Sequence, residues 1–180
     1  GSIPSELGSW TGITSAQFWD NRLTGTIPSE LGLCTSIENI AVSGNQLAGS
    51  IPSELGSWTG ITSAQFWDNR LTGTIPSEVG LWTFSESFGV QRNQLAGSIP
   101  SELGRLTSVM NAQFWDNILT GTIPSELGLW TSIEGFVLSG NNIIGLIPSE
   151  LGTWTSIAYA LLFENDLTGT IPTELGLWTS

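Results

Sequence analysis

The chain has 180 residues, of which 39% are hydrophobic and 11% are charged, with sixteen acidic side chains against four arginines. A net charge of −12 without a basic stripe excludes the electrostatic pattern of proteins that bind nucleic acid or anionic membrane surfaces. The sequence has no histidine and a single cysteine, Cys34, which excludes zinc sites of the common Cys/His type and the usual Ser-His-Asp and Cys-His catalytic arrangements.

The whole chain is built from a repeat of 24 residues. Each unit starts at a glycine, and the units start at residues 1, 25, 49, 73, 97, 121, 145 and 169. Residues 1–24 and 49–72 are identical. A fixed period of this length predicts a solenoid, in which each unit forms one coil that buries its apolar face only by stacking on its neighbours. We therefore expect a single domain over residues 1–180.

The first part of each unit predicts one short helical turn. Ile3, Pro4, Glu6 and Gly8 of the first unit have identical residues at the same place in all eight units. Proline favours the first position of a helix, glutamate suits the positive first turn, and glycine favours the end. Because the segment is so short, we expect a 3-10 turn or one helical turn.

The middle of each unit predicts a short β-strand followed by a turn. In the first unit, Ala16 and Phe18 alternate with Ser15, Gln17 and Trp19, and this period of two is typical of a strand with one buried face. Such strands, stacked at about 4.8 Å per coil, form a parallel sheet. The asparagine two residues after Trp19 recurs in all seven complete units. We expect its amide to bond the backbone of the turn and to form a ladder along the stack.

The combined pattern, W-x-x-I-x-x-A-x-F-x-x-N-x-L-x-G-x-I-P-x-x-L-G, resembles the leucine-rich repeat with tryptophan in place of the leading leucine. Its N-x-L-x-G-x-I-P-x-x-L-G portion resembles the plant-specific subclass, which is familiar from plant receptor ectodomains and polygalacturonase inhibitors. The resemblance implies a leucine-rich repeat solenoid of about seven and a half coils. It also implies a concave parallel β-sheet, short 3-10 or helical turns on the convex face, and a second short strand ahead of the proline. Plant-type arrays usually have cysteine-paired caps and this chain shows none, so we expect an uncapped part of a longer array.

A second period of 48 residues is superimposed on the first. At the buried strand position, large and small residues alternate from unit to unit: Ala16, Ile40, Ala64, Phe88, Ala112 and Phe136. Large and small side chains on neighbouring coils interdigitate, so this alternation predicts a filled core. In the fourth unit, Phe84 and Ser85 break the frame and Gly89 follows within the strand, so we expect a local distortion there.

The same longer period predicts a row of aromatic side chains on the concave sheet, one every two coils and about 10 Å apart. The row consists of Trp19, Trp67, Trp115 and Phe163. Amides precede the tryptophans and carboxylates follow them: Gln17, Gln65 and Gln113, and Asp20, Asp68 and Asp116. Three interpretations stay open. The rings cover the backbone of the next coil, form an interface with another protein copy, or stack on the sugar rings of a linear glycan.

Further exposed apolar residues are expected near the C-terminal end. Units five to seven place apolar residues at positions that are polar elsewhere, and we expect them to contact another protein or another copy of the chain: Ile118, Ile144, Leu146, Tyr159 and Leu161.

No catalytic, cofactor or metal site emerges from the acidic residues. Glycoside cleavage needs one pair of carboxylates at a fixed separation, whereas every class of carboxylate here is repeated. The stacked glutamates equivalent to Glu6 allow bridging by divalent cations, but their place in a wet first turn favours simple solvation. The sequence therefore predicts a protein that is not an enzyme and that holds no cofactor and no metal.

The first hypothesis for function is an extracellular or cell-surface structural protein that self-associates into a fibre or coat, because a repeated surface suits a repeated partner. Its partners are then copies of itself or another protein, without nucleic acid and without membrane insertion. The second hypothesis is a module that binds a linear cell-wall polysaccharide along the aromatic row. The third is ice binding through Thr-Gly-Thr, which recurs at 24–26, 72–74, 120–122 and 168–170 but alternates with Ala-Gly-Ser or Ile-Gly-Leu.

Overall fold

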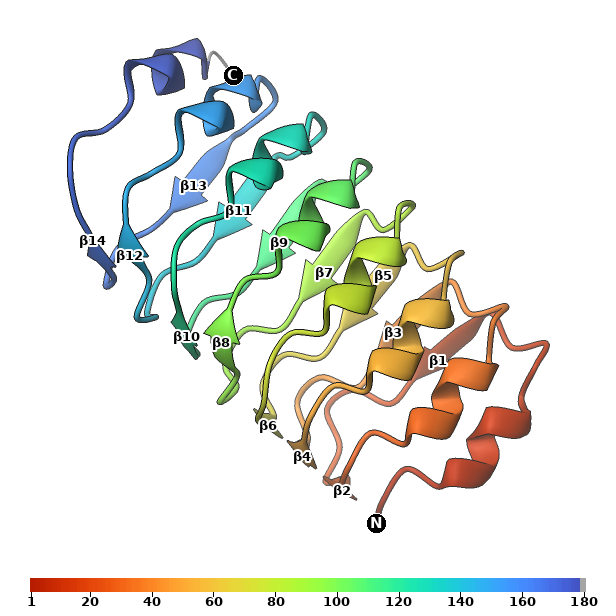
Figure 1. Cartoon of the computed structure of the whole chain (residues 1–180). Helices are drawn as coiled ribbons and strands as arrows, with labels where there is room; N and C mark the ends of the chain where they lie inside the picture. Colours follow the sequence, from red (N-terminus) through yellow and green to blue (C-terminus); the bar gives the residue numbers. More distant parts are fainter. Residues whose placement is uncertain (179–180) are drawn as a thin grey trace.

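Each 24-residue unit forms one coil of a solenoid in the computed structural model, which describes residues 1–178 (Figure 1). Every complete coil contains a 3-10 turn, a strand and a second short strand in the same order. Residues 179–180, the end of the last half unit, lie outside the described part. The predicted solenoid with a parallel sheet and short turns is confirmed.

The main sheet has seven parallel strands whose order in space equals their order in the sequence. Its strands are β1 (Ser15–Gln17), β3 (Asn39–Ala41), β5 (Ser63–Gln65), β7 (Ser87–Gly89), β9 (Asn111–Gln113), β11 (Gly135–Val137) and β13 (Tyr159–Leu161). Ala16 pairs with Ile40, and Ile40 pairs with Ala64. Residues one repeat apart are therefore direct neighbours in the stack.

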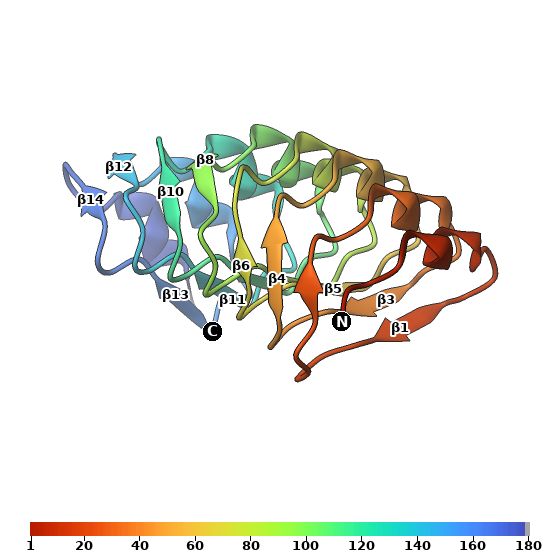
Figure 2. The same ribbon diagram turned by 90° about the horizontal axis from the view of Figure 1, so that it is seen from below.

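Second strands form three smaller sheets along the side of the solenoid (Figure 2). They are β2 (Thr24–Gly25), β4 (Gln46–Gly49), β6 (Arg70–Leu71), β8 (Ala96–Ser98), β10 (Ile118–Thr120), β12 (Ile144–Gly145) and β14 (Asp166–Leu167). Each lies ahead of the proline of the following unit, as the resemblance implies. All pairs are parallel, as in the main sheet.

A 3-10 turn follows the proline of every unit. These turns are η1 (Ser5–Ser9), η2 (Ser29–Leu33), η3 (Ser53–Ser57), η4 (Ser77–Leu81), η5 (Ser101–Arg105), η6 (Ser125–Leu129), η7 (Ser149–Thr153) and η8 (Thr173–Leu177). The turns stack closely enough to require glycine, because a Cβ atom on Gly32 would lie 2.5 Å from the carbonyl oxygen of Glu54 in the next coil.

Aromatic side chains fill the core between the main sheet and the turns. The indoles of Trp58 and Trp82 stack with centroids 6.0 Å apart, and Phe88 meets Trp82 edge to face at 5.7 Å. Each buried indole N–H needs a partner, and that of Trp58 donates to the carbonyl oxygen of Leu31 at 2.9 Å. Leu106 interrupts the tryptophan column in the fifth coil, where it is fully buried.

The asparagine ladder is present as predicted. Asn45 donates through its amide nitrogen to the carbonyl oxygens of Phe18 and Val42, at 2.9 and 3.0 Å. Its amide oxygen accepts a 2.9 Å hydrogen bond from the backbone N–H of Leu23 in the preceding coil. One side chain thus satisfies three backbone groups in two coils, and the pattern recurs at Asn69 and Asn141.

The expectation of a local distortion in the fourth coil is wrong. Strand β7 keeps the register of its neighbours, with Phe88 between Ala64 and Ala112. Ser85 is buried where the other complete coils have isoleucine or valine, and its backbone N–H still donates to the carbonyl oxygen of Trp82 at 2.8 Å. Phe84 points outward and is 64% exposed. The turn therefore accommodates the altered residues without moving the strand.

Candidate functional site

The aromatic row follows the strands of the main sheet. The backbone N–H of Asp20 donates to the carbonyl oxygen of Ser43 at 3.0 Å, and that of Gly44 donates to the carbonyl oxygen of Trp67 at 3.0 Å. These bonds stack the segment after each strand coil upon coil, so the four aromatic residues share one line. Trp19 is 54% exposed, whereas Trp67 is partly buried.

Small residues lie between the aromatic ones and are covered. Ser43, between Trp19 and Trp67 in the stack, is only 1% exposed although it occupies an outward position. A Cβ atom on Gly89 would lie 3.4 Å from Cδ1 of Trp67, so this ring leans over the next strand. Trp67 thus has the backbone-covering contact of the first interpretation. Trp19 and Phe163, which is 59% exposed, present most of their ring surface to solvent.

The glutamines beside the row mostly bond their own sheet. Gln65 donates to the hydroxyl oxygens of Ser87 and Ser63, at 2.9 and 3.3 Å, and Gln17 donates to the hydroxyl of Ser15 at 3.1 Å. Gln113 is partly buried on the same face. One of these bonds, from Gln65 to Ser87, joins two strands, and the others lie within a strand, so fewer amides are left for a ligand than the sequence suggested.

Gln91 is a residue that the sequence analysis did not single out. It takes the place of an aromatic or serine side chain in the fourth coil, and its Oε1 atom is buried without a partner among the described residues. Oε1 of Gln65 and Oε1 of Gln91 both approach the space above Gly89. The only sequence signal was the break in the alternation of aromatic and serine residues at this place.

The acidic residues after the row adopt a left-handed backbone. Asp20, Asp68 and Asp116 have φ values of 52°, 54° and 51°, a conformation that L-residues adopt at a cost of order 1 kcal/mol. Glycine takes the equivalent place in the second and sixth coils. Oδ1 of Asp68 lies 3.7 Å from Nε of Arg92, and both side chains are about half exposed. The fixed turn aims these carboxylates along the edge of the aromatic row.

The five apolar contact candidates lie on two surfaces of the structure. Tyr159 and Leu161 lie on β13 in the main sheet, whereas Ile118, Ile144 and Leu146 lie along the second strands. All five are exposed.

The exposed Tyr159 reaches across two coils of the main sheet. Its hydroxyl donates to Oδ1 of Asn111 at 3.3 Å. Its ring passes over Gly135, where an added Cβ atom would lie 2.5 Å from Cζ of the tyrosine. The C-terminal end of the main sheet is thus covered by a ring that is fixed at its tip.

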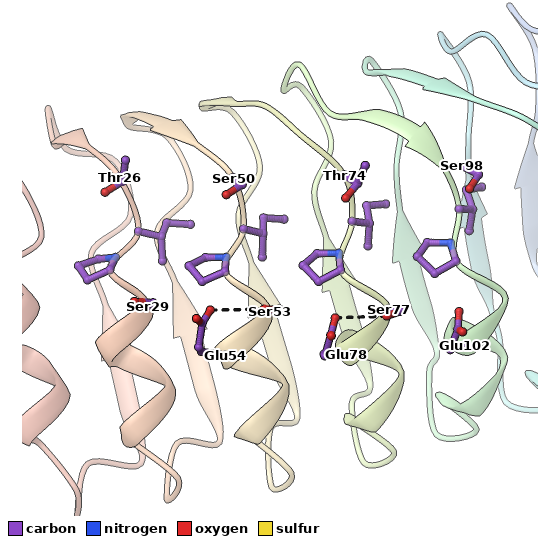
Figure 3. A pocket seen from close by; sticks show the side chains of 18 of the residues that line it. Thr26, Ser29, Ser50, Ser53, Glu54, Thr74, Ser77, Glu78, Ser98 and Glu102 are labelled. Atoms are coloured by element: carbon purple, nitrogen blue, oxygen red, sulfur yellow. Dashed lines mark hydrogen bonds between the residues drawn. The ribbon is translucent and has the colours of Figure 1, made fainter.

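A long groove runs along the side of the solenoid, between the second strands and the 3-10 turns (Figure 3). It has a volume of about 1900 Å³. Figure 3 shows a file of hydroxyl side chains along it, above the prolines and the glutamates of the turns. In residues 1–178 no group of three or more His, Cys, Asp or Glu side chains is placed to hold a metal ion. Nor is any helix of this part of the chain long and apolar enough to cross a membrane.

The comparisons with known proteins agree with this architecture. The family model of the leucine-rich repeat matches residues 132–154. The chain is 37% identical to a chain of the BIR3–SERK2 complex from Arabidopsis thaliana, covering 71% of this chain and 67% of that one, with a TM-score of 0.62. The chain belongs to the leucine-rich repeat proteins of the plant type. A search of curated proteins found no match.

Two receptors resemble this leucine-rich repeat array along nearly its whole length. The plant peptide hormone receptor RGFR1, solved in complex with RGF2, is 32% identical with a TM-score of 0.97. The ectodomain of the Arabidopsis thaliana receptor kinase GASSHO1/SCHENGEN3, in complex with CASPARIAN STRIP INTEGRITY FACTOR 2, is 38% identical with a TM-score of 0.98. The matches cover 98% and 99% of this array, which spans 28% and 21% of those two chains.

Proposed function

We propose that this leucine-rich repeat array is a non-catalytic, extracellular binding scaffold whose concave face contacts a partner polypeptide. The observation that carries the proposal is the row of aromatic side chains on the main sheet, none of which is fully buried: Trp19, Trp67, Trp115 and Phe163. Large aromatic side chains that stay exposed on a rigid surface are the residues that dominate protein interfaces. The similar ectodomains of RGFR1 and GASSHO1/SCHENGEN3 were solved with polypeptide partners, which supports the same class of partner here.

The polar groups of the concave face narrow the chemistry of the partner. Asp20 and Asp116 flank the row, and neither forms an ion pair within the described residues, whereas Asp68 is paired with Arg92. The face therefore offers aromatic surface with unpaired carboxylates beside it. It fits an extended segment that carries apolar side chains together with lysine or arginine.

Selection of peptides from a random display library on the intact chain tests this function. We expect bound peptides rich in aromatic and basic residues. We also expect slower amide hydrogen exchange at residues 15–21 and 159–165 in their presence, and unchanged exchange in the 3-10 turns. Protection confined to the turns or to the second strands would show that the concave face is not the binding surface.

Self-association is a second candidate function, and an exposed row on the convex side favours it. The last residue of the 3-10 turn is an exposed leucine in every second coil: Leu33, Leu81, Leu129 and Leu177. A periodic apolar row suits lateral packing of copies into the fibre or coat that the sequence suggested. Electron microscopy at rising concentration tests it. Filaments that disappear in a Leu33→Ser, Leu81→Ser, Leu129→Ser variant would support it, and particles that remain monomeric in the unaltered protein would exclude it.

Polysaccharide binding and ice binding stay predictions of the sequence analysis. Partial burial of Trp67 and Trp115 reduces the ring surface that is open to sugars. Retention on immobilised linear glycans tests the polysaccharide hypothesis, which fails if retention is equal in the chain with Trp19, Trp67 and Trp115 changed to Ala. Thermal hysteresis tests ice binding, and its absence in the unaltered chain would exclude that function.

A further inference from the structure

The groove along the side of the solenoid is a surface separate from the concave face. It is lined by the residues around the proline of successive units, from the first coil to the start of the seventh. Isoleucine and proline form its floor, as in Ile51 and Pro52. The residues that follow the second strands form one wall, and the first residues of the 3-10 turns form the other (Figure 3). Six coils at about 4.8 Å per step extend over about 24 Å, the length of roughly seven residues of extended chain.

One wall of the groove carries a file of hydroxyl groups. In six consecutive coils the residue before the floor isoleucine is serine or threonine, and all six side chains are exposed: Ser2, Thr26, Ser50, Thr74, Ser98 and Thr122. None of these hydroxyls has a hydrogen-bond partner within residues 1–178. They are therefore free to donate to and to accept from the backbone of a ligand.

The orientation of the threonines in this file is fixed by packing against glycine. Cγ2 of Thr26 lies 3.0 Å from where a Cβ atom of Gly49 would be, and Cγ2 of Thr74 has the same relation to Gly97 at 2.9 Å. These glycines have positive φ, at 77° and 73°. The methyl groups occupy the space that the glycines leave open, so the threonine hydroxyls have a defined direction and bind a ligand at a smaller entropic cost.

The charge of the groove has one sign. Its lining includes six glutamates and no arginine: Glu6, Glu30, Glu54, Glu78, Glu102 and Glu126. The four arginines of the chain lie elsewhere, at Arg22, Arg70, Arg92 and Arg105. A file of carboxylates with no internal counter-charge attracts a cationic ligand and repels an anionic one.

The groove ends where the hydroxyl file ends. In the seventh coil Leu146 replaces the serine or threonine, and its Cδ2 atom approaches Gly169. The lining stops at Pro148 in the same coil. The change of chemistry and the end of the groove thus coincide, which gives the surface a defined boundary in the seventh coil.

From these observations we propose that the groove binds an extended, lysine- or arginine-rich segment of a partner polypeptide. Long basic side chains reach the carboxylates of the turns while the hydroxyl file bonds the backbone of the segment. The proposal stands independently of the function of the concave face, because the two surfaces share no residue.

Fluorescence anisotropy with a labelled decapeptide of alternating lysine and serine tests the proposal on the intact chain. We expect saturable binding that weakens as salt rises, and no binding of the matching peptide of glutamate and serine. The variant Glu54→Gln, Glu78→Gln, Glu102→Gln loses three exposed ion pairs with the peptide. It is therefore expected to bind about tenfold more weakly. Thr26→Val with Thr74→Val keeps the methyl groups on the glycines, removes two hydroxyls, and is expected to weaken binding about threefold.

A matched control separates this site from general attraction to an acidic protein. Glu38→Gln, Glu86→Gln, Glu134→Gln removes the same charge from exposed glutamates that are outside the groove lining. This control variant is expected to change the affinity for the peptide less than twofold. The same is expected of a variant of the concave face, Trp19→Ala with Phe163→Ala. Equal loss in the two glutamine variants, or no saturable binding by the unaltered chain, would overturn the proposal. Thermal unfolding of each variant establishes that it is folded.

Discussion

The indole N–H of Trp58 donates a 2.9 Å hydrogen bond to the carbonyl oxygen of Leu31 in the preceding coil. The same bond joins Trp82 to Leu55 and Trp154 to Leu127. Tryptophan at the leading position of the repeat therefore does more than fill volume. Where it is present, it joins its coil to the one before through a backbone group that leucine would leave without that donor.

Replacing this tryptophan tests the bond. Trp58→Phe keeps a buried ring but leaves the carbonyl of Leu31 without its donor, so we expect a loss of about 1–3 kcal/mol in the free energy of unfolding. Trp10→Phe in the first coil, where the side chain is 43% exposed, is the control and is expected to cost less. Urea unfolding followed by circular dichroism measures both. Equal effects would mean that the bond contributes nothing beyond ring packing.

The asparagine ladder gives a second prediction. Asn117 is buried, accepts from the backbone N–H of Leu95 and donates to the carbonyl oxygens of Val90 and Phe114. Asn117→Ala leaves these three backbone groups without their hydrogen-bond partner, and we expect a destabilisation of about 2–4 kcal/mol. The exposed Asn142→Ala is the control, expected to stay within about 0.5 kcal/mol of the unaltered chain. An Asn117→Ala variant with an unchanged free energy of unfolding would contradict the structural role of the ladder.

The close stacking of the 3-10 turns gives a third prediction. Gly32→Ala brings a Cβ atom against the backbone of Glu54, and we expect a cost of about 1–3 kcal/mol or a shift of the coils. Gly60→Ala has nothing within 4 Å of the new atom and is the matched control. Thermal unfolding compares them. An unchanged melting temperature in Gly32→Ala would show that neighbouring turns are further apart than described.

Cys34 gives a prediction on pH dependence. Burial raises the pKa of its thiol above the ordinary value of 9.0, against a smaller opposing effect of the Trp10 backbone. Because the thiol ionises more readily in the unfolded chain, its contribution to stability is complete below about pH 9 and is lost as pH rises further. Cys34→Ala should abolish this part of the loss. Urea unfolding at several alkaline pH values measures it, and an identical pH profile for both chains would contradict it.

Much of the fold follows from the repeat, because the period dictates which residues stack. Ala16 against Ile40 and the turn after Pro4 were predictable, since each depends on local pattern and on one repeated contact. The row that contains Trp19 was predictable for the same reason. The sequence offered coverage of residues such as Ser43 as one of three interpretations but could not decide it, because coverage depends on the direction in which the neighbouring rings lean. The groove was not predictable either, since its depth depends on how far the second strands stand above the prolines.

The concave aromatic row is the central claim of the functional account, and calorimetric titration of a selected peptide tests it most directly. Two variants are compared with the unaltered chain: Trp19→Ala with Phe163→Ala, and Phe84→Ala, which removes an equally exposed ring outside the row. Loss of interface aromatic residues costs about 2 kcal/mol or more, so we predict roughly thirtyfold weaker binding in the first variant and less than twofold in the second. Equal affinity of all three chains for the peptide would contradict the account.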